Sequence, residues 1–196
     1  TGKTLVYVSQ NDQLMAIFFI EDRVKPETKT LISQLKDMGV TPILLTGDQE
    51  KTARYVASQV GIERVIANCL PTDKASIIQE LQKEYASVGM VGDGINDAPA
   101  LAQANVSYAM GSGTDIAMES ADIVLMEDLT RIPYSIRLSK KMRGIIKQNI
   151  IFALSVIAVL IISNLFQSIN LPLGVVGHEG STILVILNGL RLLYFK

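Results

Sequence analysis

The chain has 196 residues, of which 48% are hydrophobic and 19% are charged, and its formal net charge is −1. This composition excludes a disordered chain and a basic nucleic-acid-binding domain, and the single cysteine, Cys69, excludes a disulfide scaffold and fits a reducing compartment. The charge is unevenly distributed: residues 1–128 carry 18 acidic and 10 basic side chains, whereas residues 129–196 carry one acidic and 8 basic ones. Such asymmetry indicates that one part of the chain meets a membrane or an anion.

The first 128 residues alternate short β-rich runs with helical segments. The expected strands are Leu5–Ser9, Leu14–Ile20, Thr41–Leu45, Val65–Ala67, Val88–Val91, Val106–Met110 and Ile123–Leu125. The expected helices are Pro26–Met38, a segment ending near Val60, Thr72 to about Tyr85, Asn96–Ala104, and a short helix between the last two strands. Gly39 and Gly61 are stop signals for the first two helices. This alternation predicts an α/β fold with a doubly wound parallel sheet.

The rest of the chain is apolar in two stretches. No charged side chain occurs in residues 148–177, and after His178 and Glu179 another uncharged run extends to Leu190. Because about 20 apolar residues span a bilayer core, we expect two transmembrane helices, at about 149–168 and 173–194. Asn170, Pro172 and Gly174 indicate a short loop between them. The alternative is a buried hairpin inside a large soluble protein.

Basic residues flank this expected hairpin. Lys140, Lys141, Arg143 and Lys147 precede the first apolar stretch, Arg191 and Lys196 close the second, and the loop has no Lys or Arg. The positive-inside rule then places both ends of the chain in the cytoplasm. We therefore predict a multi-pass protein of the cell membrane with a cytoplasmic α/β domain and the lipid bilayer as a partner.

Two polar motifs follow expected strands, where open parallel sheets bind their ligands. The first is Thr46-Gly47-Asp48, and the second is Gly92-Asp93-Gly94-Ile95-Asn96-Asp97. Two carboxylates and an amide oxygen within five residues suit Mg²⁺, which often bridges substrate phosphates. Lys74 could neutralise a phosphate, and the Thr46 hydroxyl could donate a hydrogen bond to a phosphoryl oxygen. Taken singly, each motif could also be an ordinary turn or helix start.

Together, Thr46-Gly47-Asp48, Pro71-Thr72-Asp73-Lys74 and the run from Gly92 to Leu101 resemble the phosphorylation-domain motifs of P-type ATPases, ion pumps of the haloacid dehalogenase superfamily. The resemblance covers essentially the whole chain. It implies Asp93 as the Mg²⁺ ligand, supported by Asn96 and Asp97, with Thr46 and Lys74 contacting phosphoryl oxygens and Asp48 beside the water-positioning loop. The implied reaction transfers the γ-phosphoryl group of ATP to an aspartate and then hydrolyses the aspartyl-phosphate.

The resemblance also divides the chain. Residues 1–20 resemble the end of a nucleotide-binding domain and residues 21–130 a phosphorylation domain, with Asp22–Pro26 as the hinge between them. A cytoplasmic basic linker helix (131–147) and two transmembrane helices (148–196) follow. The family's nucleophile lies in an Asp-Lys-Thr-Gly-Thr run that this sequence lacks, and the chain begins with Thr-Gly-Lys rather than Met. We therefore expect the C-terminal part of a pump, inactive alone, whose partner is a missing N-terminal portion.

Two helices after the phosphorylation domain are the pattern of the heavy-metal subgroup. His178 and Glu179 are costly inside a membrane unless they are used, and they suit a divalent transition metal such as Zn²⁺, Co²⁺ or Fe²⁺. Gly177–Thr182 also resembles the His-Glu-Gly-Gly-Thr signature of cobalt-, zinc- and iron-type pumps, with Ser181 in place of Gly. In the alternative interpretation these residues only mark the outer membrane interface. Two other functions are open: a haloacid dehalogenase-type phosphatase, or a truncated, inactive, membrane-anchored pump.

Overall fold

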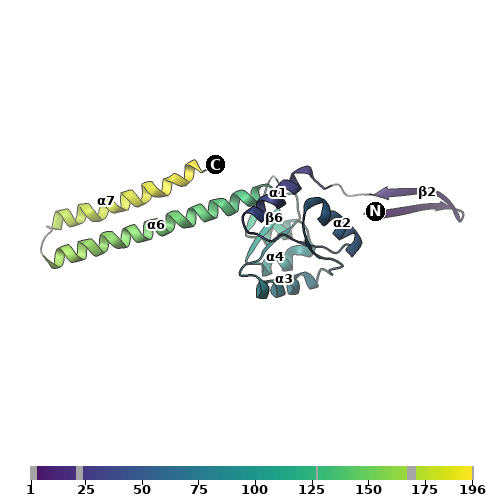
Figure 1. The fold of residues 1–196 in the computed structure, drawn as a ribbon, viewed down its shortest axis with the longest axis horizontal. Helices are drawn as coiled ribbons and strands as arrows, with labels where there is room; N and C mark the ends of the chain where they lie inside the picture. The colour runs from purple at the N-terminus through teal and green to yellow at the C-terminus, as the bar shows by residue number, and fades with distance from the viewer. Residues whose placement is uncertain (1–3, 21–23, 127, 167–170, 196) are drawn as a thin grey trace. The chain divides into compact units, whose positions relative to one another are not determined.

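A computed structural model describes residues 4–20, 24–126, 128–166 and 171–195. The chain separates into two compact units, residues 1–133 and residues 134–196. The first unit holds all the strands and the shorter α-helices, and the second consists of helix (Figure 1). Each unit is described by itself below.

The first unit begins with an antiparallel hairpin of β1 (Thr4–Gln10) and β2 (Gln13–Ile20). The turn residues Asn11 and Asp12 have φ values of 47° and 60°, the left-handed conformation that a tight two-residue hairpin turn requires and that Asn and Asp tolerate. The two expected strands are therefore confirmed. Consecutive side chains such as Val6, Tyr7 and Val8 are exposed, so both faces of the hairpin are uncovered in the part of the chain that the structure describes.

The alternating segments that follow are confirmed as strands and helices. The strands are β3 (Ile43–Leu45), β4 (Arg64–Ile66), β5 (Gly89–Gly92), β6 (Val106–Met110) and β7 (Ile123–Leu125). The helices are α1 (Pro26–Asp37), α2 (Glu50–Val60), α3 (Asp73–Glu84), a 3-10 turn (Ile95–Asp97), α4 (Ala98–Gln103) and α5 (Asp115–Glu119). Gly39 and Gly61 follow α1 and α2 with φ values of 79° and 81°, a conformation that glycine adopts without a Cβ penalty.

The expected single parallel sheet is divided into two. β3 pairs with β4 in one parallel sheet, and β5, β6 and β7 form a second parallel sheet in that order. Within the described residues β3 and β5 are therefore both edge strands and share no hydrogen-bond ladder. The alternation of strands and helices predicted the parallel direction correctly, but it carries no information on which strands become neighbours.

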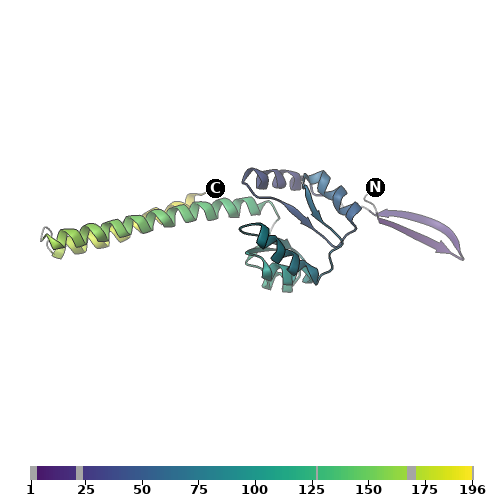
Figure 2. The same ribbon diagram turned by 60° about the horizontal axis from the view of Figure 1, so that its bottom comes forward.

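One hydrophobic core nevertheless unites the two sheets. Its buried side chains come from α3, β5 and the residue before it, α4, β6 and α5: Ile78, Leu81, Val88, Met90, Ala100, Leu101, Ala109 and Ala117. Ile43, Leu45 and Ile66 of β3 and β4 pack against this cluster. Figure 2 shows α1 and α2 on one side of the β3–β4 pair. The carboxyl ends of β3 and β5, which lead into the two polar motifs, are thus held by a shared core.

Leu101 on α4 is the large side chain whose removal should cost this core most. It is 1% exposed. We expect Leu101→Ala to lower the free energy of unfolding of the α/β unit by about 3 kcal/mol, because the truncation leaves a cavity that the fold cannot fully close. Urea unfolding followed by circular dichroism measures the change. Met126→Ala, at a side chain 80% exposed, is the control, and equal destabilisation by the two variants would contradict the core described above.

The second unit contains two long helices and a final turn: α6 (Arg131–Leu165), α7 (Leu171–Leu190) and a 3-10 turn (Arg191–Tyr194). Among the described residues one helix, α6, is long and apolar enough to cross a membrane, and its apolar part is almost entirely exposed. The basic segment at 131–147 and the apolar segment after it form one continuous helix. The expected loop position is partly wrong: Pro172 and Gly174 lie in the first turn of α7, where proline is tolerated.

The helices α6 and α7 run antiparallel (Figure 1) and share polar contacts near one end. The side-chain amide of Asn188 donates to Asn149 Oδ1 at 2.8 Å, and Asn149 Nδ2 donates to the Val185 carbonyl at 3.4 Å. Arg191 donates in turn to Asn188 Oδ1 at 2.9 Å. Interhelical hydrogen bonds of this kind hold the register of apolar helices. Of the expected second span, residues 191–194 form the 3-10 turn. The end of the expected first span, residues 167–168, and Asn170 of the expected loop lie outside the described residues.

Candidate functional site

The first polar motif forms a tight loop at the end of β3. The Thr46 hydroxyl donates to Asp48 Oδ2 at 3.0 Å and accepts from the Asp48 amide at 3.1 Å, so the motif closes on itself. Gly47 and Asp48 are exposed, and Thr46 is half-buried. A methyl group at Gly47 would lie 3.2 Å from the Cys69 carbonyl oxygen, which leaves little room for any other residue. The loop therefore presents its polar groups at the carboxyl end of the strand, as the sequence predicts.

A second loop, which sequence analysis did not assign to the site, holds the first in place. The Thr46 amide donates to the Ile66 carbonyl, the Cys69 amide donates to the Thr46 carbonyl at 3.1 Å, and the Asn68 amide donates to the Asp48 carbonyl at 2.9 Å. Asn68 has a φ of 54°, a left-handed conformation that few residues other than Gly, Asn and Asp adopt. An asparagine directly after a strand was the available sequence signal for this turn.

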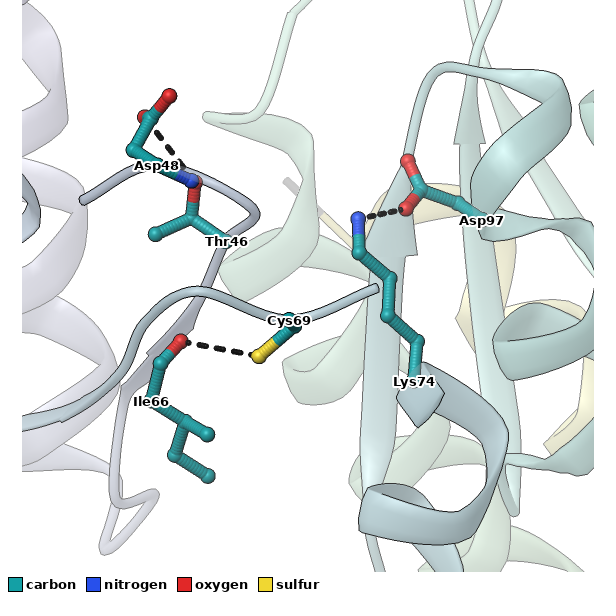
Figure 3. A network of polar contacts seen from close by, with 6 residues as sticks. All are labelled: Thr46, Asp48, Ile66, Cys69, Lys74 and Asp97. Atoms are coloured by element: carbon teal, nitrogen blue, oxygen red, sulfur yellow. Dashed lines mark hydrogen bonds and ion pairs between the residues drawn. The ribbon is translucent and has the colours of Figure 1, made fainter. Parts of the chain in front are cut away.

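Cys69 lies between the first motif and Lys74 (Figure 3). Burial raises the pKa of the Cys69 thiol, the hydrogen bond with Thr46 lowers it by a smaller amount, and the Lys74 charge also lowers it. A thiol with a raised pKa remains protonated at neutral pH, so Cys69 packs here rather than acting as a nucleophile.

Lys74 and Asp97 form an ion pair that links the start of α3 to the 3-10 turn before α4. Lys74 is in the first turn of α3, Asp97 ends the 3-10 turn after β5, and Nζ lies 2.6 Å from Oδ1. The two side chains are only 14% and 13% exposed, which makes this the least exposed ion pair among the described residues. Figure 3 shows the lysine reaching across to the carboxylate. The structure thus brings together two residues that lie 23 positions apart in the sequence.

Position 92 must be glycine because the side chain of Asp97 lies against it. A methyl group at Gly92 would lie 2.7 Å from Asp97 Cβ and 3.0 Å from its Oδ2. Glycine is needed here for lack of space and not for its backbone freedom. Among the described glycines only Gly39 and Gly61 have a positive φ, so the backbone of Gly92 would accept another residue. At Gly94, by contrast, the nearest atom to an added methyl group would be 3.9 Å away. The sequence indicated both glycines, but only the structure distinguishes their roles.

Asp93 and Asn96, the other two expected ligands, are exposed at the end of β5. No hydrogen bond or ion pair within the described residues engages the Asp93 carboxylate. The described residues contain no group of three or more His, Cys, Asp and Glu side chains arranged to hold a metal ion. Two carboxylates and an amide still fit Mg²⁺, because this ion usually keeps several waters and takes the rest of its ligands from phosphate oxygens. Such a centre would be completed by a phosphorylated ligand rather than by these side chains alone.

His178 and Glu179 lie elsewhere, in the middle of α7. Both side chains are exposed, and the helix continues through the glycines on either side without unwinding. The His178 carbonyl accepts hydrogen bonds from the Ser181 hydroxyl at 2.6 Å and the Thr182 hydroxyl at 3.3 Å. No third His, Cys, Asp or Glu of the described residues joins the pair. A metal bound here would need ligands from outside this part of the chain.

The first unit thus places three useful groups near the ends of parallel strands: the Lys74 ammonium group, the exposed Asp93 carboxylate and the Thr46 hydroxyl. A phosphoryl group would fit this set, since its oxygens can accept hydrogen bonds from an ammonium group and a hydroxyl and can share a divalent cation with a carboxylate. The side chains suit the stabilisation of a negatively charged transition state. None of the described residues in this group is an evident activated nucleophile.

Comparison with known proteins agrees with this chemistry. Residues 1–105 match the family model of the haloacid dehalogenase-like hydrolases. The chain is 51% identical to a zinc-transporting ATPase of Bacillus subtilis strain 168 over 98% of its own length and 30% of that protein. It is 39% identical to a probable cadmium-transporting ATPase of Alkalihalophilus pseudofirmus, of which it covers 27%. The crystal structure of a zinc-transporting PIB-type ATPase in the E2.Pi state superposes with a TM-score of 0.89 at 38% identity, over 98% of this chain and 32% of that one. The chain thus spans about 30% of the length of these relatives.

Proposed function

The chain belongs to the haloacid dehalogenase-like hydrolases, and from this premise we propose that it is the phosphorylation domain and the last membrane helices of an ATP-driven heavy-metal pump. The pump would work through an aspartyl-phosphate intermediate. The similarity to heavy-metal-transporting ATPases over nearly the whole chain supports this proposal, as does the composition of the site. A soluble phosphatase of the same family is less well supported, because the apolar part of α6 is exposed rather than buried in a core.

The observation that carries the proposal is the ion pair between Lys74 and Asp97. Its two partners come from separate helices, meet at 2.6 Å and are largely withdrawn from water at the end of β5. A lysine held in this way carries its charge at a fixed point before any substrate binds. Fixed charges of this kind stabilise a transition state without reorganisation, which is the main requirement of phosphoryl transfer.

Each site residue then has a role in the two half-reactions. Lys74 would neutralise charge on the phosphoryl oxygens during transfer from ATP and again during hydrolysis. The Thr46 hydroxyl would turn its hydrogen from the Asp48 carboxylate to another phosphoryl oxygen, with Gly47 leaving room for the approach. The Asp48 amide, which donates to the Thr46 hydroxyl oxygen, would keep that hydroxyl oriented. Asp93 would hold Mg²⁺, with Asp97 and Asn96 supporting it. The Mg²⁺ ion would supply charge neutralisation between the phosphate and the carboxylates.

The aspartate that receives the phosphoryl group must come from outside these 196 residues, which contain no Asp-Lys-Thr-Gly-Thr run. The division of the sheet supports a specific place for it. β3 and β5 are both edge strands, and each leads into one of the two motifs. One additional parallel strand, hydrogen-bonded to both, would join the two sheets and end between the motifs. We propose that the phosphorylated aspartate lies at the end of that strand.

The membrane part of the proposal rests on the second unit. We propose that α6 and α7 form a transmembrane hairpin with the α/β unit on the cytoplasmic side, since the basic side chains gather at residues 137–147 and 191–196. The transported ion would be a divalent transition metal bound with the help of His178 and Glu179. Glu179 is 12 residues from Arg191, or about 18 Å along a helix, which is just over half of a bilayer core of about 30 Å.

A phosphorylation assay tests the proposal directly. The 196-residue chain incubated with ATP and Mg²⁺ should form no acid-stable phosphoprotein, because it lacks the acceptor aspartate. A longer protein that adds an upstream Asp-Lys-Thr-Gly-Thr segment to the chain should form one, and hydroxylamine should remove the label, as expected of an acyl phosphate. An acid-stable label on the 196-residue chain, or none on the longer protein, would contradict the assignment.

A further inference from the structure

A glycine-rich turn between β6 and α5 contacts the main chain of the candidate site at Asp93. It comprises Gly111, Ser112, Gly113 and Thr114, and none of the roles described above uses it. The Thr114 amide donates to the backbone carbonyl of Asp93 at 3.0 Å, across 21 positions of sequence. The turn therefore reaches the residue that carries the exposed carboxylate, at its main chain rather than at its side chain.

Gly113 makes this contact possible. A methyl group at Gly113 would lie 2.4 Å from the Asp93 carbonyl oxygen, 3.1 Å from its carbon and 2.9 Å from the Met110 carbonyl oxygen. Even weak C–H···O contacts have carbon–oxygen distances of about 3.3 Å, so any residue larger than glycine must move the Asp93 peptide. The neighbouring atoms are backbone and cannot rotate away. This is the closest approach of an added methyl group to any neighbour among the described glycines.

The turn is itself anchored at both ends. The Gly111 amide donates to the Leu125 carbonyl of β7 at 2.8 Å, and the Gly113 amide donates to the Met110 carbonyl at 2.8 Å. At the other end, the Thr114 hydroxyl accepts from the Ala117 amide at 3.3 Å and caps α5. Because β7 and α5 hold the turn, the position of the Asp93 carbonyl is restricted. Its oxygen accepts from the Thr114 amide and lies too close to Gly113 for a side chain at that position.

We propose that Gly113 and the Thr114 amide are positioning groups for Asp93, which set the direction of its carboxylate by fixing the peptide that follows it. The proposal rests on the proposed function, since it assigns Asp93 to a divalent cation. The groups touch neither metal nor phosphate themselves. Outer residues that orient a ligand typically change metal affinity about 10- to 100-fold when they are altered, and the same range is expected here.

The test measures Mn²⁺ binding to the full 196-residue chain in lipid nanodiscs by electron paramagnetic resonance, with inorganic phosphate present to supply the remaining oxygen ligands and Mn²⁺ as a probe of oxygen-ligand sites. Gly113→Ala should weaken Mn²⁺ binding about tenfold or more. Thr114→Pro should do the same, because it removes the amide donor while the Thr114 backbone, with a φ of −78°, suits proline. Circular dichroism and thermal melting accompany each titration, so that folding and affinity are read separately.

Two controls separate positioning from stability. Gly89→Ala adds a methyl group on β5 at an ordinary 3.7 Å from its nearest neighbour and should bind Mn²⁺ like the wild type. Ile78→Val shortens a buried side chain of the core and should lower the melting temperature without changing Mn²⁺ affinity. Wild-type affinity in Gly113→Ala, or loss of the fold in both turn variants, overturns the positioning role alone. Wild-type Mn²⁺ binding that survives Asp93→Asn, or no binding by the wild type, overturns the proposed metal site and the positioning role with it.

Discussion

Asp93→Asn in the complete pump should reduce phosphoenzyme formation and metal-stimulated ATP hydrolysis by about 10²-fold or more, the range seen when one preorganised electrostatic group is removed. Asp93 is exposed at the end of β5, and no hydrogen bond or ion pair of the described residues engages its carboxylate. The substitution keeps the size and removes the negative charge, so the fold should persist while the attraction for Mg²⁺ is lost. Rates at several Mg²⁺ concentrations measure the effect.

Asp37→Asn is the matched control for this experiment. It removes one exposed carboxylate from the last turn of α1, away from both motifs, and should leave the Mg²⁺ dependence unchanged. Excess Mg²⁺ should restore part of the Asp93→Asn activity if the lost function is metal binding. Full activity of Asp93→Asn at ordinary Mg²⁺ concentrations would show that another residue holds the ion.

Replacement of His178 by Ala or of Glu179 by Gln should abolish activation of the complete pump by its metal. The imidazole and the carboxylate are exposed on α7. In the proposed transmembrane hairpin they would lie near the depth of the bilayer centre, where an ionisable group is costly unless it is used. With either ligand lost, ATP hydrolysis should no longer rise when Zn²⁺, Co²⁺ or Fe²⁺ is added. Phosphorylation by inorganic phosphate, which would use the site in the α/β unit, should remain.

Val176→Ala is the matched control on the same helix. Val176 is also exposed, lies two positions before His178 and has no ligand chemistry, so its variant should respond to metal like the wild type. Metal activation in both His178→Ala and Glu179→Gln would remove these residues from the transport site. It would favour the alternative in which they mark the outer membrane interface.

Local structure in this protein was largely predictable. The turn at Asn11 and Asp12, the stops at Gly39 and Gly61, and the strands of the α/β unit follow from conformational preferences that act over a few residues. The positions of the motifs at the ends of β3 and β5 also followed, because strand ends are local features. The start of α7 was predicted two residues late, because a proline such as Pro172 is as compatible with a loop as with the first turn of a helix.

Contacts across the sequence were not predictable in the same way. The pairing of Lys74 with Asp97 and the support of Thr46 by the loop of Asn68 depend on how α3, β4 and β5 pack. The division into two sheets depends on which strands are neighbours, which hydrophobic periodicity does not encode. The role of Gly113 could not be predicted, because its contact with Asp93 joins two segments 20 positions apart.

The chemical character of this protein can be read from its residue types: two motifs that suit phosphate and Mg²⁺, an apolar second part, and a histidine and a glutamate within it. Residue types carry charge, hydrogen-bonding capacity and apolarity wherever they lie, so these properties can be read without a fold. The packed fold was needed to show that Gly92 lies against Asp97 and Gly113 against Asp93, and that the Asp97 carboxylate is paired with Lys74. Those distinctions arise from distances between atoms of separate segments, and such distances exist only once the chain has packed.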